Sequence, residues 1–500
     1  MRSAQDVLNA VPERLLKALR AAAQADDARL WLVGGFVRDV LLGRPNHDLD
    51  LAVAGDVIAV ARRLAGGLGG TVVPLDPEHG TYRVALREPA GAIRELDLTR
   101  LRAAAIEQDL RLRDFSINAI AMPVAGELRL LDPTGGAGDL DARVARAAAD
   151  SAFTDDPLRL LRAVRLAVEL DFTIDEGTAA LARRDAYLLP RAAAERQRDE
   201  LARILATDHA ARGVRLLDQL GLLSVLLPDL DPARGVEQPK EHYYDVFEHS
   251  IATLAALDLV LRHEPPGDRR EAERWRALWA RLAHVPGVRA RLDAPIAEGR
   301  PRRVALKLAG LLHDVSKPET KSIDPETGKM RFYGHPELGA TRAGRLARAL
   351  RFSAREIELI ELLIAEHLRP GMLASPGESP TPRALFRFYR DLDGAVEELL
   401  LLNLADHVAA RGPRLTFEEW AGHVDYVTWL LRTLYEDETI ARPPRLLDGN
   451  DLMRELALAP GPLIGRLLEA VREAQAAGEV SDRESALALA RRELAAAGNG

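Results

Sequence analysis

The sequence predicts a multidomain α+β protein, with a mixed strand-and-helix N-terminal part followed by segments that are entirely helical. At 500 residues, the chain is longer than a typical single domain. The apolar or alternating runs expected to form strands all lie before residue 132, and no strand pattern follows Asp139. The hydrophobic content of 47% fits a globular protein, and the aromatic content of only 5% fits a helix-rich one.

The elements can be expected in a definite order. An amphipathic helix over 1–25 carries charges throughout, which excludes a signal peptide. Strands are expected at 30–33, 49–53, 82–86, 95–99 and 127–131. The predicted boundaries are 1–150 for the mixed part, 151–230 and 241–415 for two helical segments, and 440–500 for a helical tail. The Pro- and Gly-rich stretch 230–240 reads as a linker, the Pro-rich stretch 442–445 opens the tail, and 265–303 reads as a charged, loop-rich insertion.

Composition excludes several classes of protein. The chain has no cysteine, which rules out disulfides, Cys zinc sites and thiol catalysis, and suits a reducing compartment. No apolar run is long enough to span a bilayer, so we expect no membrane partner and a cytoplasmic location. The net charge of −8 argues against nonspecific coating of nucleic acid, but it leaves room for a local basic groove.

One motif near the N-terminus combines a phosphate cradle with paired carboxylates. Gly34 and Gly35 separate a strand from a helix, so bare backbone N–H groups can approach a triphosphate there. Arg38, one turn into the helix, can reach the same phosphates. Asp48 and Asp50 alternate on the next strand and therefore point to one face, as two ligands for Mg²⁺ would. These are the parts needed for two-metal nucleotidyl transfer.

The whole run from 32 to 51 resembles the nucleotidyltransferase motif of the bacterial tRNA nucleotidyltransferases (CCA-adding enzymes) and their poly(A) polymerase relatives. Three later segments continue the resemblance. Residues 113–119 are similar to the family's ribose-recognition motif, 132–140 to a following turn, and 155–165 to its nucleotide-selecting helix. Ser116 stands where the family more often has Thr, and Asp155 where it more often has Glu. Four ordered motifs over about 140 residues carry the resemblance.

This resemblance implies a polymerase-β-like head, a helical neck, and addition of C, C and A to the tRNA 3′ end from CTP and ATP, without a stable protein partner. It implies that Asp48 and Asp50 hold two Mg²⁺, one activating the primer 3′-OH and one stabilising the leaving pyrophosphate. Arg113 and Asp114 would bind the ribose. The implied nucleotide-binding residues are Gly34, Gly35, Arg38, Arg113, Asp114, Asn118, Asp156, Arg159, Arg162 and Arg165.

The chemistry of the 155–165 segment favours selection of C and A without a template. Asp156 and Arg159 are three residues apart and would be neighbours on a helix that Pro157 helps to start. A carboxylate can accept from the exocyclic amine of cytosine or adenine, and a guanidinium can donate to the ring acceptors. Uracil and guanine would place a carbonyl against the carboxylate. Arg162 and Arg165 either contact phosphate or are solvated. Asp97 is either a third palm carboxylate or a structural residue.

A second set of histidines and aspartates lies in the 241–415 segment. The adjacent His313 and Asp314 are expected inside the apolar helix 304–315, where charged residues are rare unless a metal accounts for them. The pattern resembles HD-superfamily phosphohydrolases, which are appended to many bacterial CCA-adding enzymes. The implied ligands are His249, His313, Asp314, His335, His367 and Asp406.

Neutral imidazoles favour a divalent transition metal such as Mn²⁺, Ni²⁺ or Co²⁺ over Mg²⁺. The hypothesis for this segment is a phosphodiesterase or phosphatase that acts on 2′,3′-cyclic phosphate or similar RNA ends. Lys317 would neutralise a substrate phosphate. The other histidines His242, His263, His284 and His407 match no motif.

Alternative functions share parts of this pattern. An enzyme adding only CC or only A has every motif above. A poly(A) polymerase shares the head, but usually has a basic C-terminal extension that this chain lacks. A signalling protein uridylyltransferase, from a different class, also joins a nucleotidyltransferase head to an HD domain, but would leave 113–119 and 155–165 unexplained.

Overall fold

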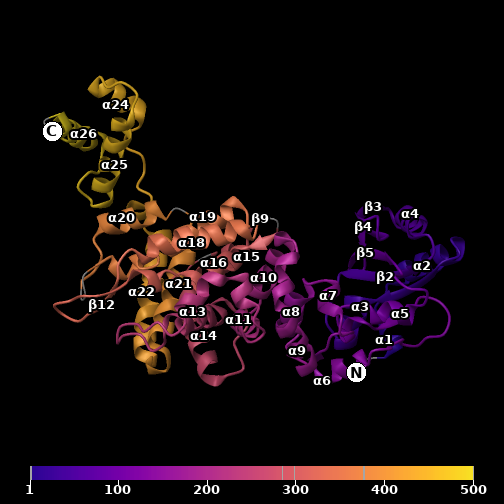
Figure 1. The fold of residues 1–500 in the computed structure, drawn as a ribbon. Coiled ribbons are helices and arrows are strands. Elements are labelled where there is room, and N and C mark those ends of the chain that lie inside the picture. Colours follow the sequence, from indigo (N-terminus) through magenta and orange to yellow (C-terminus); the bar gives the residue numbers. More distant parts are fainter. Residues whose placement is uncertain are drawn as a thin grey trace. The chain divides into compact units, whose positions relative to one another are not determined.

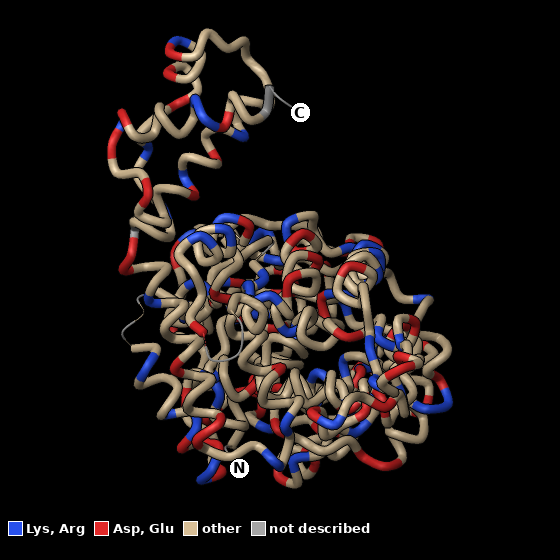
Figure 2. The backbone as a smooth tube through the Cα atoms, turned by 90° about the vertical axis from the view of Figure 1, so that its left-hand side faces the viewer, with Lys and Arg blue, Asp and Glu red and all other residues tan. Residues whose placement is uncertain are grey.

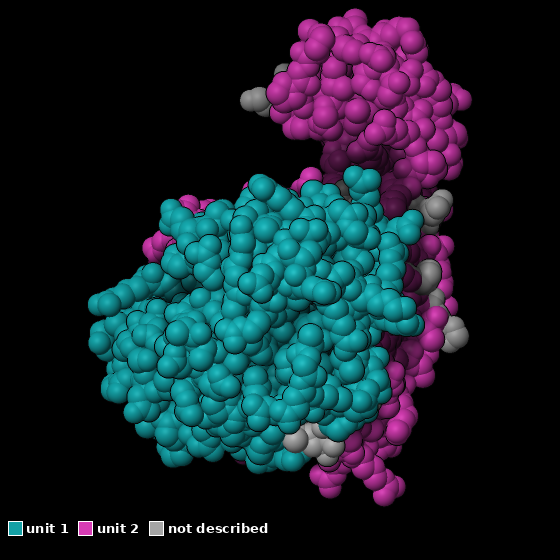
Figure 3. Space-filling view, turned by 90° about the vertical axis from the view of Figure 1, so that its right-hand side faces the viewer, with its two compact units in different colours: residues 1–204, 216–226 teal, residues 205–215, 227–500 magenta. Residues whose placement is uncertain are grey.

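The computed structural model describes residues 3–283, 285, 287–297, 299–374, 378–392 and 394–498, so His284 lies outside the described residues. The chain forms two compact units, coloured separately in Figure 3. Unit 1 comprises Met1–Ile204 and Leu216–Leu226, and unit 2 comprises Leu205–Arg215 and Leu227–Gly500. Among the described residues, no helix combines the length and apolar character needed to cross a membrane.

Unit 1 contains a six-stranded sheet in the order β3-β4-β5-β2-β1-β6 (Figure 1). Its strands are β1 (Arg29–Val33), β2 (Asp48–Ala54), β3 (Gly70–Asp76), β4 (Thr81–Ala90), β5 (Ile93–Arg100) and β6 (Ala121–Pro123). Only β2 and β5 pair in parallel within this sheet. Its early helices are α1 (Ala4–Asn9), α2 (Glu13–Ala25), α3 (Gly34–Leu42), α4 (Val57–Leu68) and α5 (Ile106–Arg111), and α4 packs on β3 and β4.

The sheet confirms the mixed α/β head and corrects three details. The run 127–131 is not a strand, because only Leu131 forms an isolated bridge, to Ala121 of β6. Strand β3 was not predicted, since Gly70 and Pro74 mask its alternation. The expected leading helix is two helices, because Pro12 caps the start of α2 and interrupts the pattern.

The remainder of unit 1 is mostly helical, as predicted for the neck. Helix α8 is amphipathic and buries Leu160, Leu161, Val164 and Val168. Two short strands, β7 (Val144–Ala145) and β8 (Thr173–Ile174), pair in parallel beside it, although no strand was expected after Asp139. The helices of this region are α6 (Gly136–Ala142), α7 (Ala152–Asp155), α8 (Arg159–Glu169), α9 (Glu176–Asp185), α10 (Ala194–Ala206), α11 (Ala210–Gln219) and α12 (Leu223–Leu226), with the 3-10 turns η1 (Ser116–Asn118) and η2 (Ala186–Arg191). Of these, the last two residues of α10 and the first six of α11 are assigned to unit 2.

Unit 2 is built around α13, α16 and α21, which pack on one another with α18 and α19. Its helices are α13 (Val246–Leu261), α14 (Arg269–Leu282), α15 (Val288–Asp293), α16 (Arg302–Leu312), α17 (Lys317–Thr320), α18 (His335–Ala349), α19 (Ala354–Ala365), α20 (Pro382–Asp391), α21 (Val396–Arg411), α22 (Phe417–Glu436) and α23 (Glu438–Ala441), with η3 (Pro228–Ala233), η4 (Arg369–Met372) and η5 (Gly412–Arg414). The expectation of a loop-rich 265–303 was wrong, because α14 and α15 occupy much of it. Two hairpins interrupt the helices: β9 (Pro295–Ala297) with β10 (Arg300–Pro301), and β11 (Lys321–Ile323) with β12 (Met330–Phe332).

The C-terminal part of unit 2 has a hydrophobic core of its own. Helices α24 (Gly449–Leu456), α25 (Pro462–Ala476) and α26 (Arg483–Gly498) bury a cluster that includes Leu452, Leu467 and Val471.

Figure 2 shows basic and acidic residues interleaved along the chain, so the net charge of −8 is dispersed rather than confined to one segment.

Candidate active site and candidate metal centre

The glycine pair predicted to cradle phosphate also makes room for Asp50. Gly34 opens α3 with a φ of +67°, a conformation that favours glycine. A Cβ atom on Gly34 would lie 2.9 Å from Asp50 Oδ2, and one on Gly35 would lie 3.4 Å from the same atom. The Phe36 N–H donates to this carboxylate across 3.4 Å. Gly34 therefore meets both a backbone conformation and a close approach to β2 that favour glycine, whereas Gly35 has room for a side chain in ordinary contact with Asp50.

Replacing Gly34 tests this packing directly. Gly34→Ala should destabilise unit 1 by about 1–2 kcal/mol, because alanine in a left-handed conformation is strained, and should lower any activity that depends on Asp50. The matched control Gly67→Ala lies in α4, where a Cβ would meet nothing within 4 Å. It should instead stabilise the protein by about 0.5–1 kcal/mol. Thermal melting of both variants checks the prediction, and equal stability of the two would contradict it.

Sheet register brings Asp97 beside Asp50. The parallel pairing of β2 with β5 sets Asp48 opposite Glu95 and Asp50 opposite Asp97. The Asp97 carboxylate accepts two hydrogen bonds from Arg83 of β4, one from Nε at 2.7 Å and one from Nη2 at 2.9 Å. Asp48 is exposed at the start of β2. The structure thus places Asp97 within the carboxylate cluster, and its role as a third palm carboxylate stays a prediction.

A pocket of about 310 Å³ lies against these carboxylates. Most of the predicted nucleotide-binding residues line it, so the structure brings together residues that are widely separated in the sequence. Its polar lining consists of Asp50, Asp97, Asp114, Asn118, Thr99, Arg38, Arg113, Arg162, Arg165 and Arg203. The buried Nε atoms of Arg113 and Arg162 have no hydrogen-bond partner in the part of the chain that the structure describes. The five arginines of the lining outnumber its three carboxylates, which fits an anionic ligand such as a triphosphate.

Asp50 and Asp114 differ in their electrostatic environment. Burial raises the pKa of the Asp50 carboxyl, and the nearby Arg113 guanidinium offsets only part of this effect. Asp114 is also buried, but the Arg162 guanidinium and hydrogen bonds from Asn118 and Phe115 hold its pKa well below the usual range. Asp50 is thus a partly buried carboxylate short of positive charge, which fits a divalent cation bound beside it.

Both oxygens of Asp114 are used within the protein. Oδ2 accepts from Arg162 at 2.5 Å, and Oδ1 accepts from Asn118 Nδ2 at 3.1 Å and from the Phe115 N–H at 2.8 Å. Asn118 Oδ1 in turn accepts from Arg38 at 2.8 Å. Asp114 and Asn118 therefore fix two pocket arginines, in addition to any contact with ribose.

The geometry expected for Asp156 and Arg159 was wrong. Asp156 does not lie on α8, which begins at Arg159, but precedes Pro157 in an extended conformation (φ −146°, ψ 102°). A residue before proline avoids the helical region for steric reasons. The Asp156 carboxylate accepts from Arg196 at 3.0 Å. Arg159 donates to the Leu112 carbonyl at 3.1 Å and forms no described ion pair with Asp156.

Arg162 and Arg165 are both paired with carboxylates, and only Arg165 is buried. Arg162 is paired with Asp114 as above, and the buried Arg165 donates to Glu200 at 2.6 Å and to Glu169 at 2.5 Å. Arg203 of α10 lines the same pocket and binds Glu169 at 3.1 Å. The sequence analysis missed Arg203 and Arg196, because they belong to a helix distant in sequence that carries no recognisable motif.

In unit 2, the six predicted HD residues meet in one cluster, in which all but the partly exposed Asp406 are buried. His249 comes from α13, His335 opens α18, His367 follows α19, and Asp406 lies on α21. His313 caps the C-terminus of α16, and Asp314 follows it. The expectation that the His-Asp pair lies inside the helix was therefore wrong, because the helix ends just before the pair.

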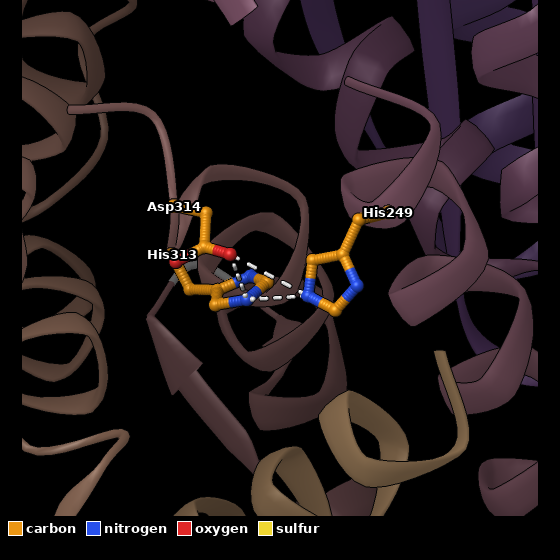
Figure 4. Close-up of side chains that lie close together, drawn as sticks. All are labelled: His249, His313 and Asp314. Atoms are coloured by element: carbon orange, nitrogen blue, oxygen red, sulfur yellow. Dashed lines mark hydrogen bonds and ion pairs between the residues drawn. The ribbon is translucent and has the colours of Figure 1, made fainter. Parts of the chain in front are cut away.

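Asp314 lies between two groups of histidines, of which Figure 4 shows the one formed by His249 and His313. Its Oδ2 is 3.5 Å from His249 Nε2 and 3.2 Å from His313 Nε2. Its Oδ1 is 3.3 Å from His335 Nε2 and 3.8 Å from His367 Nε2. Asp406 Oδ1 joins the first group, 2.9 Å from His249 Nε2. Asp314 is therefore shared by two sets of three side chains, each with the spacing of a metal site.

Backbone carbonyls orient three of these imidazoles. The Nδ1 atoms of His313, His335 and His367 lie 2.7–2.9 Å from the carbonyls of Gly310, Phe332 and Ile364. We assign a proton to Nδ1 in each ring, which leaves Nε2, the ring nitrogen nearer Asp314, as the atom that would bind a metal. Metal-binding histidines are oriented in this way.

The electrostatics of this cluster also fit cations. Burial opposes ionisation of Asp314, but the neighbouring His313 and Lys317 charges hold its pKa well below the usual range. Despite burial, Asp314 and Asp406 raise the pKa of His313 to about 10, whereas burial and the His313 charge lower that of His367 to about 3. Lys317 Nζ lies 2.6 Å from Asp314 Oδ2 and donates to Gln238 Oε1 at 2.8 Å. Without metal, the carboxylates therefore take their compensating charge from Lys317 and His313.

Comparison with protein families yields three matches in chain order. The family described as "Poly A polymerase head domain" matches residues 30–146. "Probable RNA and SrmB-binding site of polymerase A" matches 171–234, and "HD domain" matches 246–411.

Two curated relatives match along nearly their whole length. The A-adding tRNA nucleotidyltransferase of Deinococcus radiodurans is 36% identical over 92% of this chain and 94% of its own. The CC-adding tRNA nucleotidyltransferase of Thermus thermophilus is 36% identical over 91% of this chain and 92% of its own. A solved structure of a CCA-adding enzyme with ATP shares the fold, with a TM-score of 0.63 and 22% identity over 99% of both chains.

Proposed function

Because this chain belongs to the tRNA nucleotidyltransferase family, we propose that it adds C, C and A to the 3′ end of tRNA from CTP and ATP. The observation that carries the proposal is the arginine-lined pocket that ends on Asp50 and Asp97. Arginine guanidiniums bind phosphate oxygens in bidentate geometry, so this lining suits a nucleoside triphosphate. The carboxylates lie beside the same pocket, where the α-phosphate must meet the primer.

In this proposal Asp48 and Asp50 hold Mg²⁺, which supplies activation of the primer 3′-OH and neutralises the leaving pyrophosphate. The chain's own groups bind and orient the nucleotide. The guanidinium groups of Arg113 and Arg162, which line the pocket, would donate to phosphate oxygens. The backbone at Gly34 and Gly35 would approach the triphosphate without side chains in the way.

The extent of addition is decided by one experiment. The protein is incubated with tRNA lacking its last three nucleotides, and separately with tRNA ending in CC, each with CTP, ATP or both, and the products are sequenced. Complete CCA on the shorter tRNA supports the proposal. Addition of CC only, or of A only to the CC-ended tRNA, would assign the partial activity named for the Thermus or Deinococcus relative. No extension of either tRNA would overturn the proposal.

Base selection would depend on Asp156 and Arg159. We expect Asp156→Ala to relax discrimination against UTP and GTP, because the acceptor that repels their carbonyls is removed. Arg159→Ala should lower the use of both CTP and ATP. Steady-state kinetics with each of the four nucleotides measures both effects. The exposed Glu176, which pairs with Arg183 on α9, offers a control in Glu176→Ala. If Asp156→Ala lowers the rate with all four nucleotides equally, this residue positions another group and does not discriminate between bases.

A second activity is favoured by the sharing of Asp314 between two histidine groups. We propose that this centre holds divalent transition metal ions and hydrolyses phosphoesters, with 2′,3′-cyclic phosphate ends as the substrate class. Histidine-rich donor sets favour such metals over Mg²⁺. The bound metal would supply Lewis acidity toward the phosphate. The chain would hold Asp314 in place through Lys317 and orient the imidazoles through backbone carbonyls.

A further inference from the structure

A pocket of about 660 Å³ in unit 2 has no part in either proposed activity. It is lined by α20, α21, α22 and α25, and by the Pro-rich segment that leads to the C-terminal helices. Helices α20 and α25 lie side by side in Figure 1 and contact each other directly. A volume of this size is typical of small-ligand sites.

The lining carries an excess of positive charge. It includes five arginines, Arg291, Arg390, Arg442, Arg445 and Arg472, against one carboxylate, Glu397. Glu397 is already committed, since it accepts from the Tyr435 hydroxyl at 2.5 Å and lies 3.2 Å from Arg291. The carboxylate in the lining is therefore unable to neutralise the remaining arginines.

Two of the arginines in the lining are already paired with carboxylates of the protein. Arg291 contacts Glu397 and Glu398, and Arg390 contacts Asp391, Glu469 and Glu473. In contrast, Arg442, Arg445 and Arg472 have no hydrogen bond or ion pair within the described ranges. Arg442 and Arg445 are exposed and Arg472 is half-buried, so an anion that enters the pocket would meet three guanidiniums that no protein carboxylate neutralises.

The segment carrying two of these arginines is fixed rather than free. Gln475 Nε2 of α25 donates to the Pro444 carbonyl at 2.8 Å. Arg472 lies three residues before Gln475, on the same side of α25. Pro443 and Pro444 also restrict the backbone between Arg442 and Arg445. The three guanidiniums are thereby brought to one pocket at a reduced entropic cost.

The lining also includes aromatic side chains. Phe386 and Tyr389 of α20 are buried, and Tyr389 donates to the Leu430 carbonyl at 2.9 Å. Tyr435 of α22 is 39% exposed and lines the pocket. Arginines beside an aromatic surface combine phosphate contacts with a face on which a base can stack.

From this arrangement we propose that the pocket binds a nucleotide, with Arg442, Arg445 and Arg472 on its phosphates and Tyr435 against its base. The nucleotide is either free or part of an RNA strand, since both present the same phosphate and base chemistry. This proposal is independent of the head pocket and of the HD centre, because it uses none of their residues.

The test is hydrogen exchange on the full chain, which locates binding and so separates this pocket from the head. ATP, tripolyphosphate and a short single-stranded RNA are the probes. We expect ATP, the RNA or both to slow exchange in α20, in 434–445 and in α25. In the double variant Arg442→Gln and Arg445→Gln, about ten times more ligand or more should be needed to reach the same protection, since two charged phosphate contacts are lost. Arg472→Gln should act in the same direction.

Arg466→Gln is the matched control, because Arg466 is an exposed arginine of α25 that does not line the pocket. Protection by ATP would assign a free nucleotide, and protection by RNA alone would assign a strand. Tripolyphosphate as effective as ATP would overturn the stacking of a base on Tyr435. No protection by any probe, or equal protection in the arginine variants and the Arg466→Gln control, would overturn the site.

Discussion

Asp50→Asn should reduce nucleotide addition by well over about a hundredfold, since even residues that only support a metal ligand cost about 10–100-fold when changed. The Asp50 carboxylate is partly buried, accepts one hydrogen bond of 3.4 Å from Phe36, and lies beside Asp97 at the edge of the nucleotide pocket. Asparagine preserves the shape of the side chain but cannot supply the negative charge that Mg²⁺ requires. Asp48→Asn should have the same effect.

Primer extension with CTP and ATP measures this loss, and filter binding measures affinity for tRNA, which should largely survive. The matched control is Asp76→Asn on β3, an exposed carboxylate of the same sheet that pairs only with His79 among the described residues. It should retain the wild-type rate. Addition by Asp50→Asn within roughly tenfold of wild type would remove Asp50 from the catalytic role.

Asp314→Asn should have the largest effect in unit 2, because Asp314 is shared by both histidine groups. The wild-type protein should bind about two transition ions, and this variant should lose both of them. His249→Ala should lose the ion near Asp406, and His335→Ala the ion near His367. Phosphoester hydrolysis should fall with metal content, while nucleotide addition should persist in all three variants.

Elemental analysis of the purified proteins, after loading with Mn²⁺, Co²⁺ or Ni²⁺, measures the number of ions bound. His263→Ala is the control, because His263 is half exposed and contacts Asp293 away from the centre. A wild-type protein that binds none of these ions and hydrolyses no 2′,3′-cyclic phosphate would reduce the cluster to a structural element of the helical body. Metal content unchanged in Asp314→Asn would exclude a shared ligand.

Local patterns in the sequence were enough to predict much of the head and the nature of its chemistry. The alternation around Asp48 and Asp50 predicts a strand with both carboxylates on one face, and β2 confirms the strand. The order of the His and Asp positions predicts a shared cluster, and the structure brings all six together. These predictions succeeded because each rests on the period of one element or on ordered motifs.

Predictions about the exact path of the backbone were less successful. Asp156 was expected on the selecting helix, but it precedes a proline and therefore takes an extended conformation. Its carboxylate accepts a hydrogen bond from Arg196 instead. Strand β3 was not predicted because Gly70 and Pro74 have a weak β-propensity, and the strand forms through its pairing with β4. Sheet pairing is a non-local energy that a short window of sequence does not contain.

The sequence by itself determined that the chain has a mixed head and helical remainder, and which residue types supply phosphate and metal chemistry. Only the tertiary structure decided that Asp97 joins Asp50, that Arg203 joins the nucleotide pocket, and that Asp314 is shared by two histidine groups. It also placed Arg442, Arg445 and Arg472 around one cavity. The physical reason is that each of these contacts joins residues from elements far apart in the chain, so their proximity depends on how strands pair and helices pack, and not on any local periodicity.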